Sequence, residues 1–360
     1  MAYFENGAYY VHNSEITTMK RCGLKWHYAY VRKLEPVIKP RPLYLGSVFH
    51  AGLQYLYLGK DANKAMALAV GEDIQNVIQS GKLSGHVLDD YIRESYTRLE
   101  LCQRVMDGYI EYDKQYPIFG EGNLANLDGI PLIERTFEVP IEGLFYNGYP
   151  VMYRFTLDMA YERNGAIWLV DHKTGKQLMD VRKLDLDTQL SLYIWALGQV
   201  MDAPVVGMEY NLIRMVTPKE PQLVKKGDRL SMAAIDTTWD IFRDSVVKHG
   251  FDPDDYEDMQ LKLMQKKFFD RKHRYRTANE LSTAANELKM AAEDLIDESK
   301  NVYRNATNDC VWDCPYRELC IMEFKGEDKQ SVDEYVERNF VIGVNRRESN
   351  DHIGTIIDKM

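Results

Sequence analysis

The sequence predicts an α/β protein in which a small sheet is embedded in helical material. Residues 131–173 hold three runs of β-type composition, PLIERTFEVPI, YPVMYRFTLDMAYE and AIWLVDHKTG, separated by turn signals. Apolar residues three or four positions apart predict helices on both sides of this segment. A fourth β-type run, PVVGMEYNLIRMV (204–216), follows a helix predicted at 188–200. This strand–helix–strand order is typical of an α/β core.

The predicted elements divide the chain into parts of different character. A helix at 14–34 begins at Ser14 as a candidate cap, and EPVIKPRP (35–42) ends it. We expect one domain over 1–325, followed by a charged, partly flexible tail over 326–360. The domain comprises a helical part (14–125), the α/β core (130–216), a second helical part (217–305) and a cysteine-containing segment (306–322).

The composition is that of a globular protein, with 45% apolar and 28% charged residues. No apolar stretch approaches the roughly 18–20 residues needed to span a membrane, and the N-terminus lacks the features of a signal peptide. We therefore expect a soluble, intracellular protein. The net charge of −10 argues against a protein that coats nucleic acid. A protein with this net charge can still contain a local basic channel.

The turn Asn164-Gly165 fixes a register between two of the β-type runs. Asn-Gly is the strongest short signal for a two-residue hairpin loop, which pairs the residues on either side of it. Counting outward places Asp171 opposite Asp158. Opposite residues point to the same face, with Cβ atoms about 4.5–5.5 Å apart, and Lys173 shares that face because side chains alternate along a strand. The turn predicts an Asp–Asp–Lys cluster, unless a β-bulge shifts the register.

This cluster has two interpretations. Two carboxylates so close repel each other and favour a bound cation or a shared proton, and hard oxygen ligands suit Mg²⁺ or Mn²⁺. The plainer alternative is a salt-bridged strand end, in which Lys173 neutralises one acid. His172 points to the opposite face, so its backbone carbonyl is a better candidate ligand than its ring.

Three of the five cysteines suggest a second inorganic site. Cys310, Cys314 and Cys320 fall within eleven residues. In an intracellular chain such clustering is typical of metal or cofactor ligation rather than of disulfides. Cys102 lies in a helical pattern, where we expect a small buried apolar residue.

These residues resemble a known family. Asp158 followed by DHKTG (171–175) is similar to the D…D-x-K-T-G core of the PD-(D/E)XK nucleases, and most similar to their RecB-type branch, which includes the Cas4, AddB and exonuclease V proteins. GSVFH (46–50) resembles the G-x-x-x-H motif of that branch, and QLSLY (189–193) its Q-x-x-x-Y motif. Cys22 with the three clustered cysteines resembles its iron–sulfur staple, with x₃ in the first gap where the family leads us to expect x₂.

The resemblance implies a restriction-endonuclease-like core, a small mixed sheet flanked by helices, and metal-assisted hydrolysis of phosphodiester bonds. His50, Asp158, Asp171 and the backbone carbonyl of His172 would hold one or two ions of Mg²⁺ or Mn²⁺. Lys173 would orient or activate the attacking water and add positive charge near the transition state.

Three further residues have alternatives. Gln189 and Tyr193 are four positions apart and share a helix face. The resemblance implies that Gln189 orients Lys173 or the phosphate, and that Tyr193 supports it or stacks near the strand being cut. Tyr193 fits a core stripe of that helix equally well. Glu134, on the first predicted strand, could reach the surroundings of the metal, but a solvated strand face is the favoured interpretation.

The set Cys22, Cys310, Cys314 and Cys320 fits three interpretations. A 4Fe–4S cluster takes four thiolates, and one remote thiolate fits the cluster of the family. Structural zinc prefers a close pair of cysteines on each side, and free thiols are the third alternative. A cluster would tie the N-terminal helix to the C-terminal segment and close a very long loop.

The main nucleic-acid candidate is a basic segment interleaved with aromatic residues, since cations bind phosphates and rings stack on bases. Its cations are Lys266, Lys267, Arg271, Lys272, Arg274 and Arg276, and Trp26 is a further candidate. A solvated charged face is the alternative.

Together, the motifs predict a divalent-metal-dependent DNA exonuclease that prefers single-stranded ends and acts in recombination, repair or DNA processing. A non-catalytic Fe–S DNA-binding adaptor is one alternative, although an inactive relative could lose its catalytic charges freely. A nuclease subunit of a helicase, recombination or CRISPR-type complex is another, and the absence of G-x-x-x-x-G-K-[ST] would put any motor on another chain. We expect a cytoplasmic protein in a bacterial or phage-infected cell, with no membrane contact, and leave a homo-oligomer open.

Overall fold

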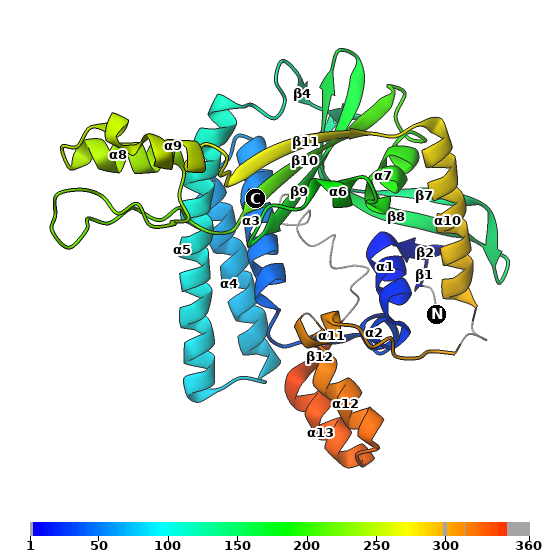
Figure 1. The fold of residues 1–360 in the computed structure, drawn as a ribbon. Helices are drawn as coiled ribbons and strands as arrows, with labels where there is room; N and C mark the ends of the chain where they lie inside the picture. The colour runs from blue at the N-terminus through cyan, green and yellow to red at the C-terminus, as the bar shows by residue number, and fades with distance from the viewer. Residues whose placement is uncertain (1–2, 298–300, 313, 344–360) are drawn as a thin grey trace.

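The computed structural model describes residues 3–297, 301–312 and 314–343, and it has a mixed α/β fold (Figure 1). Its main strands are β1 (Tyr3–Glu5), β2 (Ala8–His12), β4 (Asn123–Leu124), β7 (Ile133–Tyr146), β8 (Tyr149–Arg163), β9 (Ala166–Gly175), β10 (Val205–Arg214) and β11 (Phe269–Tyr275). They form one eight-stranded sheet in the order β1-β2-β8-β9-β10-β11, with β4 and β7 also paired to β8. The pairs β2–β8 and β9–β10 are parallel, and the others are antiparallel. The predicted α/β class and central mixed sheet are confirmed.

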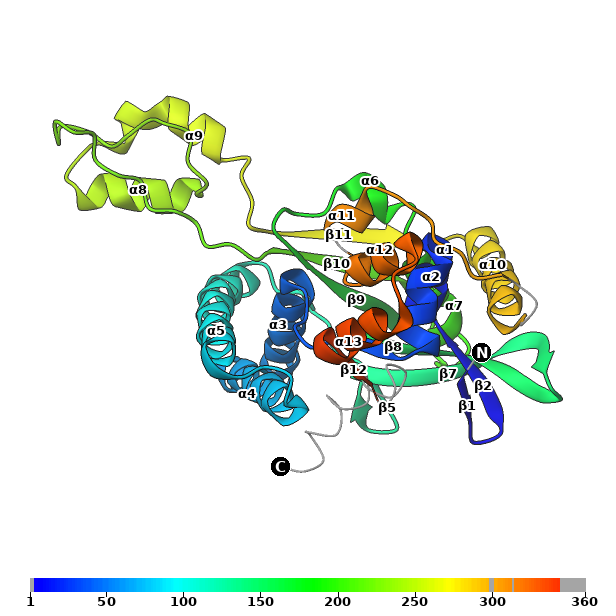
Figure 2. The same ribbon diagram turned by 90° about the horizontal axis from the view of Figure 1, so that it is seen from below.

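Helices cover both faces of this sheet (Figures 1 and 2). The helices α3 (Arg41–Tyr57), α4 (Ala62–Ser80) and α5 (Gly85–Gln115) share a core that includes Ile213 of β10. The helices α7 (Thr188–Leu197) and α10 (Ala278–Ile296) share another core that includes Leu212 of β10. Because side chains alternate along a strand, these two helix groups lie on opposite faces.

Asn-Gly turns connect the antiparallel strands. Asn6-Gly7, Asn147-Gly148 and Asn164-Gly165 all have positive φ at both residues, as a tight hairpin turn of this kind requires. Across the third turn Arg163 pairs with Ala166, which confirms the register predicted from the sequence.

The C-terminal elements pack against the helical segment and the short strand that follow β2 (Figure 1). The expected helix at 14–34 is broken at Cys22, whose extended backbone separates α1 (Asn13–Arg21) from α2 (Gly23–Trp26) and the π-helix η1 (His27–Val31). The C-terminal elements are α11 (Asp309–Trp312), α12 (Arg317–Lys325), α13 (Lys329–Asn339) and β12 (Phe340–Ile342), and β12 pairs with β3 (Leu34–Pro36). The sequence predicted a charged tail from 326, but its first part is helix and strand because Phe340 buries its ring against Tyr316. Residues 344–360 of that tail lie outside the described residues.

A helical insertion stands away from the sheet between β10 and β11 (Figures 1 and 2). It contains α8 (Trp239–Lys248), the 3₁₀-helix η2 (Pro253–Tyr256) and α9 (Glu257–Leu263), around a small apolar core of its own. The strand β11 that follows differs from the helical part expected at 217–305. Its inward side chains include that of Arg271, and this buried charge conceals the apolar alternation of a buried strand. The remaining short elements are β5 (Asn126–Leu127), β6 (Ile130–Pro131) and α6 (Val181–Leu184).

No described helix is both long enough and apolar enough to cross a membrane.

Gly207 of β10 is packed too closely to accept a side chain. A Cβ atom added there would lie 2.6 Å from the backbone oxygen of Arg274 on β11. Gly207→Ala should therefore push the two strands apart and lower the free energy of unfolding by about 1–3 kcal/mol in urea denaturation. The control is Gly71→Ala in α4, where nothing lies within 4 Å, and where the change should raise stability by up to about 1 kcal/mol. Equal effects of the two substitutions would contradict the close packing of β10 and β11.

Candidate active site

The acids predicted to face each other meet where the β8–β9 ladder ends. The last paired residues are Met159 and Val170. One step further, the carboxylate of Asp158 accepts a hydrogen bond from the backbone N–H of His172, with a distance of 2.7 Å. Asp158 therefore joins the end of β9 through its side chain instead of its backbone, and its carboxylate stays close to Asp171.

Asp171, Lys173 and Gln189 form a closed triangle. The Lys173 ammonium lies 2.8 Å from Oδ2 of Asp171 and 3.2 Å from Oε1 of Gln189. The Gln189 amide donates to Oδ1 of Asp171 at 3.1 Å. Asp171 is only 4% exposed. Although its Oδ2 atom is near Lys173, it accepts no well-aligned hydrogen bond from the described residues, so it can still bind a cation.

The start of α7 orients Gln189 towards this triangle. Asp187 caps the helix by accepting from the backbone N–H of Gln189 at 2.9 Å. The hydroxyl of Tyr210 on β10 donates to the other oxygen of Asp187 at 3.0 Å. The cap therefore ties the first turn of α7 to the strand beside β9.

His50 faces a second group of acids. Its Nδ1 atom lies 3.8 Å from Asp158 and 3.9 Å from Glu134, and the ligand atoms of the three residues lie within 4.8 Å of one another. The Nε2 atom donates to the backbone carbonyl of His172 at 2.9 Å. This bond leaves Nδ1 as the nitrogen that can bind a metal when the ring is neutral.

Glu134 belongs to this group, although the sequence favoured a solvated position for it. The neighbouring pairs Ile133–Met159 and Arg135–Leu157 place Glu134 across from Asp158. Its backbone has φ of 46°, a left-handed conformation that costs a non-glycine residue about 1–3 kcal/mol and is often found at functional sites.

Burial sets the protonation of these groups. It raises the pKa of Asp171 to about 6, because the effect of Lys173 is partly offset by the charge of Asp158. Burial disfavours a charged His50, but the carboxylates of Asp158 and Glu134 raise the pKa of His50 to about 9. Three carboxylates beside one lysine therefore attract further positive charge. A divalent cation suits this donor set, since Mn²⁺ accepts both oxygen and imidazole ligands.

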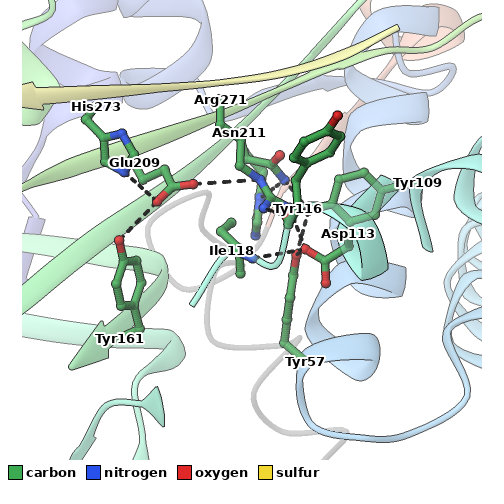
Figure 3. A network of polar contacts seen from close by, with 11 residues as sticks. Tyr57, Tyr109, Asp113, Tyr116, Ile118, Tyr161, Glu209, Asn211, Arg271 and His273 are labelled. Carbon is green, nitrogen blue, oxygen red and sulfur yellow. Dashed lines mark hydrogen bonds and ion pairs between the residues drawn. The ribbon is translucent and has the colours of Figure 1, made fainter. Parts of the chain in front are cut away.

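The ring of His172 lies on the other face of the sheet and contacts Asn211. Asn211 belongs to the buried polar network that Figure 3 shows. The Nδ1 atom of His172 is 2.8 Å from the amide nitrogen of Asn211, which donates to the Tyr109 hydroxyl at 2.7 Å. The Tyr57 ring stacks parallel to the imidazole. Burial lowers the pKa of His172, so the ring is neutral and its Nδ1 can accept the bond from Asn211. No sequence pattern predicted this role of Asn211.

The network continues to the outer strand (Figure 3). Asp113 of α5 accepts from Tyr57 at 3.2 Å and forms an ion pair with Arg271 of β11. Glu209, which is 3% exposed, accepts from Tyr161 at 3.0 Å. We call His50, Glu134 and Asp158 the metal group. The carbonyl of His172 lies against this group, while its ring is held by side chains from α3, α5 and β10.

Tyr193 packs in the core beside Gln189. Its ring lies 5.2 Å from that of Phe155, and it joins the apolar cluster between the sheet and α7. This placement fits the core-stripe interpretation, and a role in stacking on a substrate stays a prediction.

The four cysteines of the predicted staple line one pocket of about 350 Å³. None forms a disulfide. Backbone N–H groups point at two of the sulfurs: Asn305 at Cys22 with 3.4 Å, and Thr307 at Cys310 with 3.4 Å. Cys102 is buried in α5, as the sequence predicted.

Most of the predicted nucleic-acid cations have internal partners. Ion pairs join Lys267 and Lys272 to Asp270, Arg271 to Asp113, Arg274 to Asp185 and Lys266 to Asp236. Arg276 is almost fully buried and binds Ser191 and backbone carbonyls. Trp26 is 7% exposed because the break at Cys22 turns it inward, where it donates to Glu15. This burial argues against contact of the Trp26 ring with a base, and a binding role for Trp26 and the other residues stays a prediction.

Comparison with known proteins identifies the class. Residues 13–321 match the family model of the PD-(D/E)XK nuclease superfamily. The chain therefore belongs to that superfamily, which confirms the resemblance at this level, and the RecB-type branch stays a prediction. No curated protein matches the chain.

Metal binding should compete with protons at His50. The raised pKa of about 9 keeps His50 protonated at neutral pH in the metal-free protein, and a cation needs the neutral ring. Mn²⁺ affinity should therefore fall as the pH drops below about 9, and binding at pH 7.5 should release protons. Calorimetry in buffers of different ionisation enthalpy measures this release. The absence of proton release in the wild type would contradict the assignment, and His50→Gln should show less release than the wild type.

Asn211 should support the metal group through the His172 peptide. Asn211→Leu removes the bonds to His172 and Tyr109 at similar volume, and should weaken Mn²⁺ binding about 10–100-fold, as is typical when a residue supporting a metal ligand is lost. Calorimetry measures the affinity, and circular dichroism checks the fold. Asn76→Leu on exposed α4 is the matched control. Unchanged affinity in a folded Asn211→Leu protein would show that the carbonyl needs no such support.

Proposed function

We propose that the protein is a divalent-metal-dependent DNA exonuclease that degrades single-stranded ends. One observation carries this proposal: the partly buried triangle of Asp171, Lys173 and Gln189 lies beside the acid group around His50. A salt-bridged strand end would need only one acid and the lysine. The additional acids make sense if a cation binds there.

His50, Glu134 and Asp158 would hold the cation, with Asp171 as a further ligand. The His172 carbonyl, predicted as a ligand from the sequence, instead accepts from Nε2 of His50 and would orient the imidazole. When bound, a divalent ion lowers the pKa of an attacking water and stabilises the charge that grows on the phosphate. The donor set fits Mg²⁺ through its oxygens and Mn²⁺ through both oxygens and imidazole.

Lys173 would act as a fixed cation. Burial disfavours its charge, but Asp171 outweighs this effect and raises the pKa of Lys173. A lysine that keeps its proton cannot remove one from water, so it would orient the water and stabilise the phosphate. Gln189 would hold the ammonium in place through its 3.2 Å contact.

The exonuclease activity and the preference for single-stranded ends rest on the resemblance to the RecB-type branch. The same resemblance supports a role in DNA recombination, repair or processing, alone or with a helicase partner. The buried catalytic charges favour an enzyme over a non-catalytic adaptor, since three acids without a cation lower stability.

We also propose that Cys22, Cys310, Cys314 and Cys320 hold a 4Fe–4S cluster. They share one pocket, and backbone N–H groups face the sulfurs, as suits thiolates that bind iron. Among the described residues, no three of these sulfurs lie within 4.8 Å of one another. Tetrahedral zinc, with bonds of about 2.3 Å, would hold the four sulfurs less than 4.8 Å from one another. The wider spacing favours a cluster over zinc.

The first experiment measures cleavage of end-labelled DNA with Mg²⁺ or Mn²⁺. Linear single strands should be degraded and single-stranded circles, which have no ends, should persist. Asp171→Asn and Lys173→Met should each reduce the rate by about 10²–10⁴-fold, because each removes charge that stabilises the transition state. Lys64→Ala, at an exposed position of α4, is the control.

The outcomes separate the parts of this proposal. If no nucleic acid is cut with either metal, the protein is not a nuclease. If circles are cut as fast as linear strands, it is an endonuclease.

A second experiment tests the cluster. Anaerobically purified protein should be brown and contain about four iron and four sulfide per chain. Cys320→Ala should lose the colour and the iron, whereas Cys102→Ala, buried elsewhere in α5, should keep both. Colourless protein with stoichiometric zinc would disprove the cluster.

A further inference from the structure

A long groove runs along α5 on the side of the sheet that carries the His172 ring. We name it the α5 groove, and its volume is about 1130 Å³. Arg104 lines it near one end and Tyr116 near the other, twelve residues along the helix, which corresponds to about 18 Å. The neck of the helical insertion and the start of β11 form its other wall. Arg271 of the polar network lies on its inner surface.

The acids of the α5 groove already have cationic partners. Glu111 pairs with Lys114 at 2.7 Å, Asp240 with Arg243 at 3.5 Å, and Asp270 with Lys267 at 3.0 Å. Glu209 is buried, and its Oε1 atom lies 3.7 Å from the Arg271 guanidinium. The carboxylates of the groove are therefore neutralised from within the protein.

Two arginines of the α5 groove have no such partner. Neither Arg104 nor Arg163 forms an ion pair with any residue that the structure describes. The Arg163 guanidinium carbon lies 5.1 Å from the centroid of the Trp168 ring and 5.4 Å from that of the Tyr161 ring, and these cation–π contacts hold it at the groove. Because the acids of the groove are paired and these two arginines are not, the unpaired charge is positive and favours an anionic ligand.

Two tyrosine rings lie between Arg104 and Arg163, since the Arg163 guanidinium lies beside Gly120, four residues beyond Tyr116. Tyr116 is 53% exposed, and its ring centroid lies 5.3 Å from that of Tyr112 on the same helix. The Tyr112 ring also contacts the Arg271 guanidinium at 5.2 Å, which fixes its plane. Free cations at both ends with rings between them match a strand of alternating phosphates and bases.

We propose that the α5 groove is a second binding site for single-stranded nucleic acid, separate from the metal group. Arg104 and Arg163 bind phosphates, and Tyr116 stacks on a base. This inference rests on the proposed function, because the strand is the substrate or product of the same enzyme. It predicts that long strands use both sites, whereas strands of two or three nucleotides use only the metal group.

Binding can be measured without cleavage. A labelled oligothymidylate of about 20 nucleotides, longer than many single-strand sites, is titrated with the full protein in EDTA, and fluorescence anisotropy reports binding. Arg104→Glu with Arg163→Glu should weaken binding at least about tenfold, because charged hydrogen bonds are lost. The slope of log affinity against log salt should decrease by about 1.4, for two phosphates on a single strand. Tyr116→Ala should also weaken binding, and Tyr116→Trp should restore it.

Arg93→Glu, on an exposed part of the same helix, is the matched control. Arg104→Gln with Arg163→Gln serves if the reversed charges lower the melting temperature. Equal loss in the control, or unchanged affinity and salt slope in the groove variants, would overturn the proposal. Displacement of the strand by polyglutamate as readily as by unlabelled DNA would show a general anion surface instead and would also overturn it.

Cleavage assays separate this inference from the proposed function. The groove variants should raise KM for long strands and leave the cleavage of trinucleotides unchanged. If the wild type binds the strand through the α5 groove but cuts no DNA, the nuclease proposal is refuted and the proposal for the α5 groove stands. If the wild type cuts DNA and the groove variants bind and cut as the wild type does, the nuclease proposal stands and the proposal for the α5 groove is refuted.

Discussion

Repulsion between buried carboxylates is the constraint on which the rest of the site depends. Glu134, Asp158 and Asp171 come from three neighbouring strands and meet where little water can separate their charges. Lys173 and a protonated His50 offset this repulsion in the absence of metal. The left-handed backbone of Glu134 adds a further cost. A fold selected only for stability would avoid such an arrangement, and its presence indicates a function that needs it.

The strand β9 connects this charged group to a second polar system. Asp171 and Lys173 point to the side of α7, and the His172 ring between them points to the side of α3 and α5. The carbonyl of His172 therefore contacts His50, and the ring of the same residue contacts Asn211. Changes in the packing of α5 can reach the metal group through this short connection, without any contact to the metal.

The sequence predicted the parts of the site that depend on local geometry. The Asn164-Gly165 turn lies only a few residues from Asp158 and Asp171, so counting along two strands was enough. Glu134 could not be found in this way. A bulge between Pro140 and Phe145 shifts the β7–β8 register by three residues, and counting from Asn147-Gly148 places Phe137 there instead of Glu134.

The other differences have similar causes in long-range packing. The strand β11 looked helical because its inward Arg271 is charged, and this charge is neutralised by Glu209 and Asp113 from distant segments. The burial of Trp26 depends on the break at Cys22, which the helical pattern over 14–34 did not predict although Gly23 follows it directly. The family assignment did not depend on these elements, since its motifs lie on β8, β9, α3 and α7.

The pairing of β12 with β3 sets a lower limit on the length of a stable chain. The composition after residue 325 suggests a dispensable tail, but Phe340 closes a small core with Tyr28, Leu34 and Tyr316. A protein shortened to that boundary would expose these side chains together with an unpaired strand edge, and both features promote aggregation. Any shortened version for crystallisation or expression should therefore keep the residues through Ile342.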